Sequence, residues 1–166
     1  MNDSPSKALC CAVLTVSNTR TTANDDAGDL LAASLEAAGH RVLRREIVFD
    51  DIYQLRRAYS ECIADPQIQV VLSTGGTGFS RHNCVPEAVG VLLDREVTGF
   101  GELFRQLSYN EIGAAAIQSR CLGGYANGTL IFCLPGSPGA CSLAWTHILR
   151  PQLDHRTRPC NFAGRA

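Results

Sequence analysis

The sequence predicts an α/β fold, a three-layer α/β/α sandwich built on a mostly parallel sheet. Two observations support this prediction. Short apolar runs bounded by turn residues are typical of strands buried on both faces of a parallel sheet. Amphipathic stretches of helical period lie between those runs in the first half of the chain. Such alternation of strand and helix is typical of a sheet wrapped by helices.

Four segments have the composition of strands. Three are continuous apolar runs and are expected at the centre of the sheet: residues 8–16, 68–72 and 129–134. Residues 41–48 are more polar, so this strand is expected nearer an edge. The segment 121–128 is rich in glycine and also contains asparagine, which predicts a turn or a hairpin.

Four segments have helical periodicity. They are residues 26–38, 51–64, 100–107 and 139–149. The clearest is 100–107, where apolar residues follow one another at i, i+3, i+4 and i+7 from Phe100 to Leu107. The second helix is expected to take either Asp50 or Asp51 as its N-cap.

Length and composition indicate one folded domain. The chain has 166 residues, of which 45% are hydrophobic and 19% charged, and this composition is sufficient for a core. We expect a flexible N-terminus at 1–7, a single domain at 8–154 and a C-terminal tail at 155–166.

Several classes of protein are disfavoured. The formal net charge of −1 argues against a nucleic-acid-binding protein, which usually has a basic excess. No apolar run approaches the roughly 20 residues of a membrane span, and the first residues are polar, so a cytoplasmic protein is expected. The eight cysteines include no C-x-x-C pair, which argues against a zinc site. Cys84 could be a nucleophile beside His82, but an incidental loop thiol is the favoured interpretation.

Ligands of such folds bind outside the carboxyl ends of the strands, so the residues after each strand matter most. The richest of these segments is Thr74-Gly75-Gly76-Thr77-Gly78. Its glycines allow close backbone approach and let N–H groups turn toward an anion. It lacks the lysine of a Walker A loop, and Arg81 replaces the last glycine of a dinucleotide fingerprint. From local chemistry alone, a ligand loop and a plain tight turn fit equally well.

Several further motifs, separated from this loop along the chain, belong to the same pattern. They are Leu14-Thr15-Val16-Ser17, the loop Ser73–Gly78 followed by Pro86-Glu87-Ala88, residues 94–102, Gln118-Ser119-Arg120, Leu134-Pro135-Gly136-Ser137 and Arg158-Pro159-Cys160-Asn161-Phe162. In order and spacing the chain resembles the MoaB/MogA family of molybdenum cofactor biosynthesis proteins from about residue 8 to residue 162. The closing Arg-Pro-Cys-Asn-Phe resembles the MoaB branch.

The resemblance implies a protein that binds molybdopterin and acts in molybdenum cofactor biosynthesis. It implies a homotrimer or a dimer of trimers that works with other proteins of that pathway. Better-defined relatives adenylylate molybdopterin with Mg-ATP and release pyrophosphate. A non-catalytic molybdopterin-binding or carrier protein of the same fold is the alternative, and a general phosphate-binding module is a more remote one.

The resemblance also carries site residues onto this sequence. Catalysis would involve Asp50 and position 83, and a magnesium ion would be held by Asp50 and Asp51. Position 83 is Asn83 where the family has aspartate, which puts activity in doubt unless Asp51 or Glu87 substitutes. The residues implied to bind the cofactor are Ser17, Thr74, Gly75, Gly76, Thr77, Gly78, Pro86, Glu87, Gly99, Glu102, Arg105, Ser119, Arg120, Gly136, Ser137 and Pro138.

Some of these positions have competing interpretations. Glu102 and Arg105 would form a solvated ion pair if they are not ligand or trimer contacts. Arg120 would be an ordinary surface arginine if it does not hold a phosphate. A bulky residue at Gly76 is expected to block ligand binding and to leave the fold intact.

Overall fold

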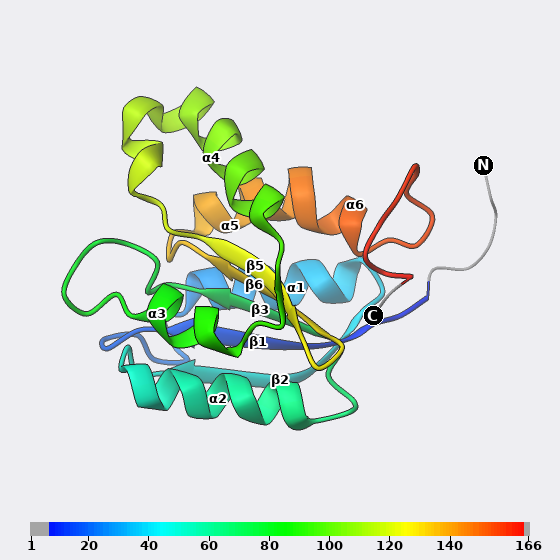
Figure 1. Ribbon diagram of the computed structural model, residues 1–166, viewed down its shortest axis with the longest axis horizontal. Helices are drawn as coiled ribbons and strands as arrows, with labels where there is room; N and C mark the ends of the chain where they lie inside the picture. Colours follow the sequence, from blue (N-terminus) through cyan, green and yellow to red (C-terminus); the bar gives the residue numbers. More distant parts are fainter. Residues whose placement is uncertain (1–6, 165–166) are drawn as a thin grey trace.

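A six-stranded sheet forms the middle of the fold, which the computed structural model describes for residues 7–164. The strands are β1 (Cys10–Val16), β2 (Arg41–Val48), β3 (Val70–Thr74), β4 (Arg95–Glu96), β5 (Leu122–Ala126) and β6 (Thr129–Leu134). Their order across the sheet is β2-β1-β3-β6-β5-β4 (Figure 1). β2, β1, β3 and β6 are parallel, whereas β5 pairs antiparallel with both β6 and β4. The predicted mostly parallel sheet is confirmed.

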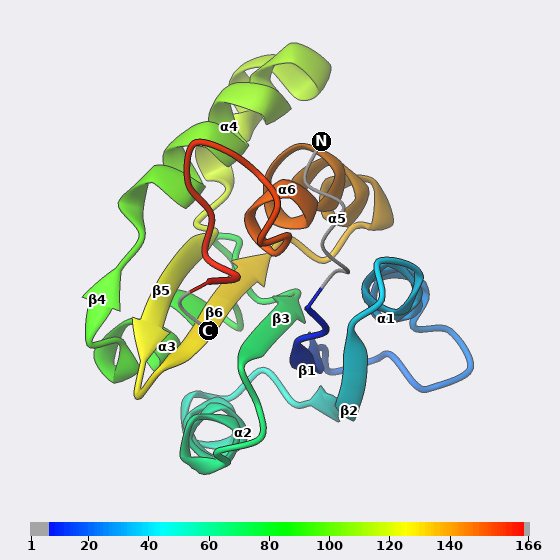
Figure 2. The same cartoon turned by 90° about the vertical axis from the view of Figure 1, so that its right-hand side faces the viewer.

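Helices cover both faces of this sheet. The α-helices are α1 (Asp26–Ala37), α2 (Ile52–Ala64), α3 (Val85–Val89), α4 (Thr98–Ile112), α5 (Pro138–Ala144) and α6 (Arg150–Gln152). Short 3-10 turns follow α3 and α4 at η1 (Gly90–Leu92) and η2 (Gly113–Gln118), and a π-helical turn, η3 (Trp145–Leu149), joins α5 to α6. Figure 2 shows α1, α4, α5 and α6 on one face and α2 and α3 on the other. No helix within residues 7–164 combines the length and the apolar character that crossing a bilayer requires.

Each face of the sheet has its own apolar core, as a three-layer fold requires. On one face Leu31 and Leu35 of α1 pack with Phe104 of α4. On the other face Leu55 and Tyr59 of α2 are completely buried against the sheet. The central strands are therefore covered on both sides, which explains their continuous apolar runs.

Two predicted strands, 41–48 and 129–134, have the bounds that the structure shows. The strand expected at 68–72 instead runs over Val70–Thr74, because its two polar end residues have partners inside the fold. The Thr74 hydroxyl donates to the Pro135 carbonyl at 2.8 Å, and the Ser73 hydroxyl accepts from Tyr59. Satisfied hydroxyls can continue a buried strand, which the apolar pattern does not register.

The glycine-rich segment 121–128, for which a turn or a hairpin was predicted, forms β5 and the turn that joins it to β6. Asn127 (φ 48°) and Gly128 (φ 83°) make its turn, in the left-handed region that two-residue hairpin turns need. The strand character of β5 was not predicted, since glycine is unusual inside strands. The structure supplies the reason: a Cβ at Gly124 would lie 2.5 Å from Leu93 Cδ1, so this strand passes too close to its neighbours for side chains.

The C-terminal end of the chain differs from the predicted division into a domain and a tail. Residues 1–6 of the predicted flexible N-terminus lie outside the described residues. Within the predicted tail, Ala163 is buried and Phe162 packs against the core. The backbone N–H groups of Phe162 and Ala163 both donate to the Gln152 carbonyl, at 2.9 and 3.1 Å. This part of the tail is attached to the domain.

His40 joins the start of β1 to the start of β2. Its Nδ1 accepts the backbone N–H of Leu9 at 3.2 Å, and the residue is only 6% exposed. Burial lowers the pKa of His40 below its ordinary value of 6.5, and the Asp154 carboxylate opposes this only in part. The folded protein therefore holds His40 as a neutral acceptor.

This depressed pKa predicts a pH-dependent stability. The unfolded chain takes up a proton at His40 more readily than the folded chain. The contribution of neutral His40 to the free energy of unfolding should be complete above about pH 6.5, the pKa of the unfolded chain. It should decrease as the pH drops from there toward the lower pKa of the folded protein. His40→Asn keeps an acceptor for Leu9 and removes the titration. Urea unfolding from pH 5 to pH 8 should give a flatter profile for this variant, and identical profiles would contradict the prediction.

Candidate functional site

The loops that follow β3 and β6 touch at the carboxyl edge of the sheet. The Gly75 N–H donates to the Leu134 carbonyl at 2.9 Å. A Cβ placed on Gly136 would lie 3.4 Å from the Gly75 Cα. The two turns therefore meet through backbone atoms, and a hollow lies on each side of their contact.

The larger hollow, called the main groove below, has a volume of about 430 Å³. It runs between the glycine loop, the turn after β6 and the α4–η2 segment. Its lining residues are Gly75, Gly76, Thr77, Gly78, Asn83, Phe104, Ser108, Ile112, Gln118, Ser119, Pro135, Gly136, Ser137 and Ala140. The glycine loop contributes backbone to this lining, and the α4–η2 side contributes both apolar residues, among them Ile112, and polar ones such as Ser108 and Ser119.

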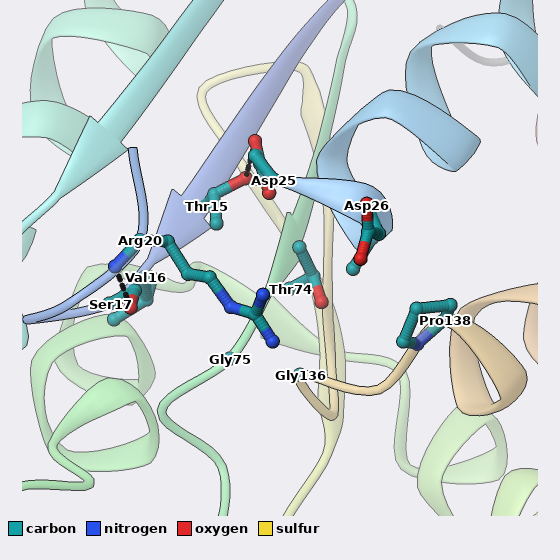
Figure 3. Close-up of a pocket in the computed structure, with 11 residues that line it drawn as sticks. Thr15, Val16, Ser17, Arg20, Asp25, Asp26, Thr74, Gly75, Gly136 and Pro138 are labelled. Atoms are coloured by element: carbon teal, nitrogen blue, oxygen red, sulfur yellow. Dashed lines mark hydrogen bonds between the residues drawn. The ribbon is translucent and has the colours of Figure 1, made fainter. Parts of the chain in front are cut away.

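The smaller hollow, called the β1 pocket, has a volume of about 120 Å³ and shares Gly75 and Gly136 with the main groove. Figure 3 shows the exposed Arg20 side chain extending across it toward Thr74 and Gly136. The Ser17 hydroxyl accepts the backbone N–H of Arg20 at 3.0 Å and so holds the start of this loop. Asp26 and Pro138 close the other side of the pocket.

The first two glycines of the loop are required by the backbone. Gly75 has φ 99° and Gly76 has φ 70°, a region that disfavours side chains. A Cβ at Gly75 would lie 2.2 Å from the Val16 carbonyl oxygen, and a Cβ at Gly76 would lie 2.5 Å from Val85 Cγ2. The expectation that a bulky residue at Gly76 leaves the fold intact is therefore wrong, because that residue would collide with the core.

Asp50 lies under this loop and is only 8% exposed. Its Oδ1 accepts the Cys84 N–H at 3.0 Å, and its Oδ2 accepts the Asn83 side-chain amide at 3.3 Å. The Asn83 Oδ1 is occupied by the Ser80 N–H at 3.1 Å, which fixes the orientation of the amide. Asn83 therefore turns an N–H donor, and not an oxygen, toward Asp50.

Asp51 has a different structural role from Asp50, because it caps α2. Its Oδ1 accepts the N–H groups of Tyr53 and Gln54, both at 3.0 Å, so Asp51 is the N-cap of α2. The sequence left this cap open between the two aspartates. Capping by Asp51 leaves the Asp50 carboxylate facing the loop.

The other expected residues lie apart from the main groove. Pro86, Arg105 and Arg120 line a separate hollow of about 500 Å³ between α3, α4 and β5. Gly99 and Glu102 are exposed on α4. Arg105 Nη1 donates to the Ser119 carbonyl at 3.2 Å, and the described residues show no ion pair between Arg105 and Glu102.

Comparison with known proteins decides the family. Residues 12–155 match the family described as "Probable molybdopterin binding domain". Molybdenum cofactor biosynthesis protein B of Escherichia coli (strain K12) is 52% identical over 151 residues, covering 91% of this chain and 89% of the relative. The chain belongs to the MoaB/MogA family. It is a molybdenum cofactor biosynthesis protein of the MoaB type.

Solved structures of MoaB proteins share the fold. A crystal structure of a molybdenum cofactor biosynthesis protein B superposes with a TM-score of 0.86 at 42% identity, covering 89% of this chain and 92% of that one. The tungsten cofactor synthesizing protein MoaB from Pyrococcus furiosus superposes with a TM-score of 0.75 at 33% identity, covering 85% and 89% of the two chains. The predicted MogA-like fold is confirmed.

The residues around Asp50 do not fit the magnesium site that this MoaB-type chain was expected to carry. Magnesium prefers oxygen ligands in near-octahedral geometry. Here Asn83 presents an N–H to Asp50, and the Asp51 carboxylate is engaged at the helix cap. Within residues 7–164, no group of three or more His, Cys, Asp or Glu side chains is placed to hold a metal.

Cys84 is disfavoured as a nucleophile in this MoaB-type site. Partial burial and the nearby Asp50 and Glu87 carboxylates raise the pKa of its thiol. A nucleophilic cysteine needs the opposite shift, because the thiolate is the reactive form. The raised pKa therefore favours an incidental loop thiol.

Sequence reasoning did not nominate several residues that line the two hollows of this MoaB-type protein. In the β1 pocket they are Asp25, Asp26 and Ala27, whereas Thr15 and Val16 belong to a motif of the family resemblance and Arg20 to the segment after the first strand. In the main groove they include Phe104, Ser108 and Ile112. Asp25 had a usable signal, since it precedes a helical stretch, and it is the N-cap of α1. The apolar groove wall had none, because groove and core residues of α4 share one stripe.

Proposed function

We propose that the chain binds molybdopterin in the main groove. Molybdopterin combines a pterin ring system with a phosphate, and the groove is lined by apolar residues such as Ile112 together with the glycine loop, whose backbone a ligand can approach closely. Its volume of about 430 Å³ lies within the range of roughly 300–1,000 Å³ typical of small-molecule sites. The decisive observation is that most of the glycine loop, Gly75 to Gly78, lines this groove together with Ser119 and Ser137 from two further family motifs.

The geometry favours binding without catalysis. Adenylyl transfer needs groups that hold two phosphates in line and neutralise their charge. At the place where the family implies a second carboxylate, Asn83 supplies a neutral amide that already donates to Asp50. We propose a non-catalytic molybdopterin-binding or carrier protein. Adenylylation with Mg-ATP is the second candidate, supported by Asp50 at the edge of the loop.

Binding in the main groove predicts a clean steric test at Gly136. An added Cβ would make only an ordinary contact, 3.4 Å from the Gly75 Cα, and Gly136 has no positive φ. Gly136→Ala should therefore keep its melting temperature while placing a methyl group where the two hollows meet. We expect molybdopterin affinity to fall by about tenfold or more, roughly 1.4 kcal/mol.

Gly139→Ala is the matched control, because a Cβ at that position meets open space and Gly139 lines neither hollow. Isothermal titration with molybdopterin should separate the two variants. Equal affinities for Gly136→Ala and the parent would place the ligand elsewhere.

The role of Asn83 can be tested by pyrophosphate release from Mg-ATP and molybdopterin. The parent protein should release little. Asn83→Asp restores a second carboxylate beside Asp50 and should raise or create the activity, whereas Asp50→Asn should abolish any that exists. Folding is checked by circular dichroism before rates are compared. A parent as fast as an established adenylyltransferase would contradict the carrier role.

We also propose that the protein assembles as a homotrimer or a dimer of trimers. Tyr109, Ile112 and Ile117 are exposed apolar residues of α4 and η2, and Ile117 is 75% exposed. Figure 1 shows α4 and the turn after it projecting from the body of the fold. Exposed apolar surface of this kind is typical of an interface between subunits.

Light scattering at micromolar concentration should return a mass three or six times that of one chain. Ile117→Glu should shift the protein toward monomer, since burying an unpaired carboxylate is costly. Val91→Glu, at an exposed apolar residue away from α4, should leave the mass unchanged. A monomeric parent would refute the assembly.

A further inference from the structure

The loop that follows the glycines, residues 78–83, surrounds the guanidinium of Arg120. Nε and Nη2 donate to the Gly78 carbonyl at 3.0 and 2.8 Å, and Nη2 also donates to the Asn83 carbonyl at 2.7 Å. Nη1 pairs with the Glu87 carboxylate of α3. The two ends of loop 78–83 and the helix beyond it therefore share one cation.

Two further contacts complete this enclosure. The Phe79 ring lies over the guanidinium, with 5.0 Å from Cζ to the ring centroid. The Arg120 backbone N–H donates to the Thr77 carbonyl at 2.9 Å. As a result only 24% of the Arg120 side chain is exposed. The Phe79 ring covers one face of the guanidinium and the loop carbonyls occupy its edge.

Arg120 is thus poorly placed to bind a phosphate. All three of its guanidinium nitrogens already donate within the chain. Arg20 differs in this respect, because it is exposed over the β1 pocket. Within the described residues its guanidinium makes one hydrogen bond, from Nη1 to the Asn24 carbonyl at 2.9 Å. An anion reaching Arg120 would first have to displace the loop.

The carbonyl that Arg120 holds belongs to the residue that contacts Asp50. Asn83 donates its side-chain amide to Asp50, and the next backbone N–H, from Cys84, donates to the same carboxylate. We propose that Arg120 is a positioning residue, which holds loop 78–83 closed and so places Asn83 against Asp50 at the edge of the main groove. The planar fork suits this role because Nη2 donates to both loop carbonyls while Nη1 reaches Glu87; a lysine ammonium has its three donors on one nitrogen and could not span the same distance.

Limited trypsin digestion at Arg81 reports on loop closure without any ligand. Arg81 is exposed within a turn closed by the Asn83 N–H and the Ser80 carbonyl, at 3.0 Å. Cleavage there requires the turn to open, so its rate follows the population of the open loop. Arg120→Ala should raise cleavage after Arg81 by about tenfold or more, and Arg120→Lys by less. Methylguanidinium should restore protection to Arg120→Ala.

Two comparisons isolate the loop. Cleavage after the exposed Arg156 is the internal reference, since a general loss of stability would raise both sites together. Arg41→Ala removes a guanidinium from another exposed position and should change neither. If Arg120→Ala does not fold, cleavage after Arg81 is measured in Glu87→Gln and Arg120→Lys instead, and both should be cleaved faster than the parent. Unchanged cleavage after Arg81 in the folded Arg120 variants, measured by mass spectrometry, would overturn the proposal.

The consequence for molybdopterin rests on the proposed function, whereas loop closure does not. If the groove binds molybdopterin, affinity should fall in Arg120→Ala and recover with methylguanidinium in step with protection at Arg81. Loss of affinity with a fully protected Arg81 would instead make Arg120 a direct ligand and refute its positioning role. If Arg120→Ala is cleaved faster than the parent after Arg81 but the parent itself does not bind molybdopterin, the positioning role is upheld and the proposed function is refuted.

Discussion

The contact between the turns after β3 and β6 is the constraint on which the site depends. Gly75 is held by the Leu134 carbonyl, its Cα faces Gly136, and a side chain at Gly75 would run into the Val16 carbonyl. Three neighbouring strands thus converge on a point where there is room for backbone alone. Both hollows share Gly75 and Gly136 at this contact, and the glycine loop is fixed from beneath by core residues.

This constraint links ligand recognition to stability. The same glycines that bring the backbone toward the main groove also let it pass between Val16 and Val85. Substitutions at Gly75 or Gly76 therefore cannot separate binding from folding. Gly136 can, because its missing side chain leaves space in the hollow and not in the core.

The sequence was sufficient for the elements whose residues carry a strong periodic signal. β2 and β6 have their expected bounds: a continuous apolar run defines β6, and a more polar strand-like run defines β2 near the edge of the sheet. β4 could not be predicted, because it has two exposed residues, Arg95 and Glu96, and exists only through pairing with β5. α3 was missed for a similar reason: five residues provide too few turns for a periodic stripe.

The site was predictable in outline and not in its contacts. The glycine loop and the turn around Ser137 could be named from motifs, because each follows a strand directly. The contacts of Arg120 could not, since its partner carbonyl at Gly78 is 42 residues away in sequence. The choice between Asp50 and Asp51 as helix cap depended on the backbone of Asp51, whose extended conformation (φ −132°, ψ 137°) aims its carboxylate at the helix.

The segment through which the sequence resembles the MoaB branch packs the end of the chain against the core. Phe162 closes the Arg-Pro-Cys-Asn-Phe motif, and its ring lies 6.3 Å from that of Phe132 and 6.5 Å from that of Tyr125. Neither partner lines the main groove or the β1 pocket. The closing phenylalanine of the motif therefore anchors the end of the chain to the aromatic core, so a substitution there should loosen the chain end and leave the contact between Gly75 and Gly136 in place.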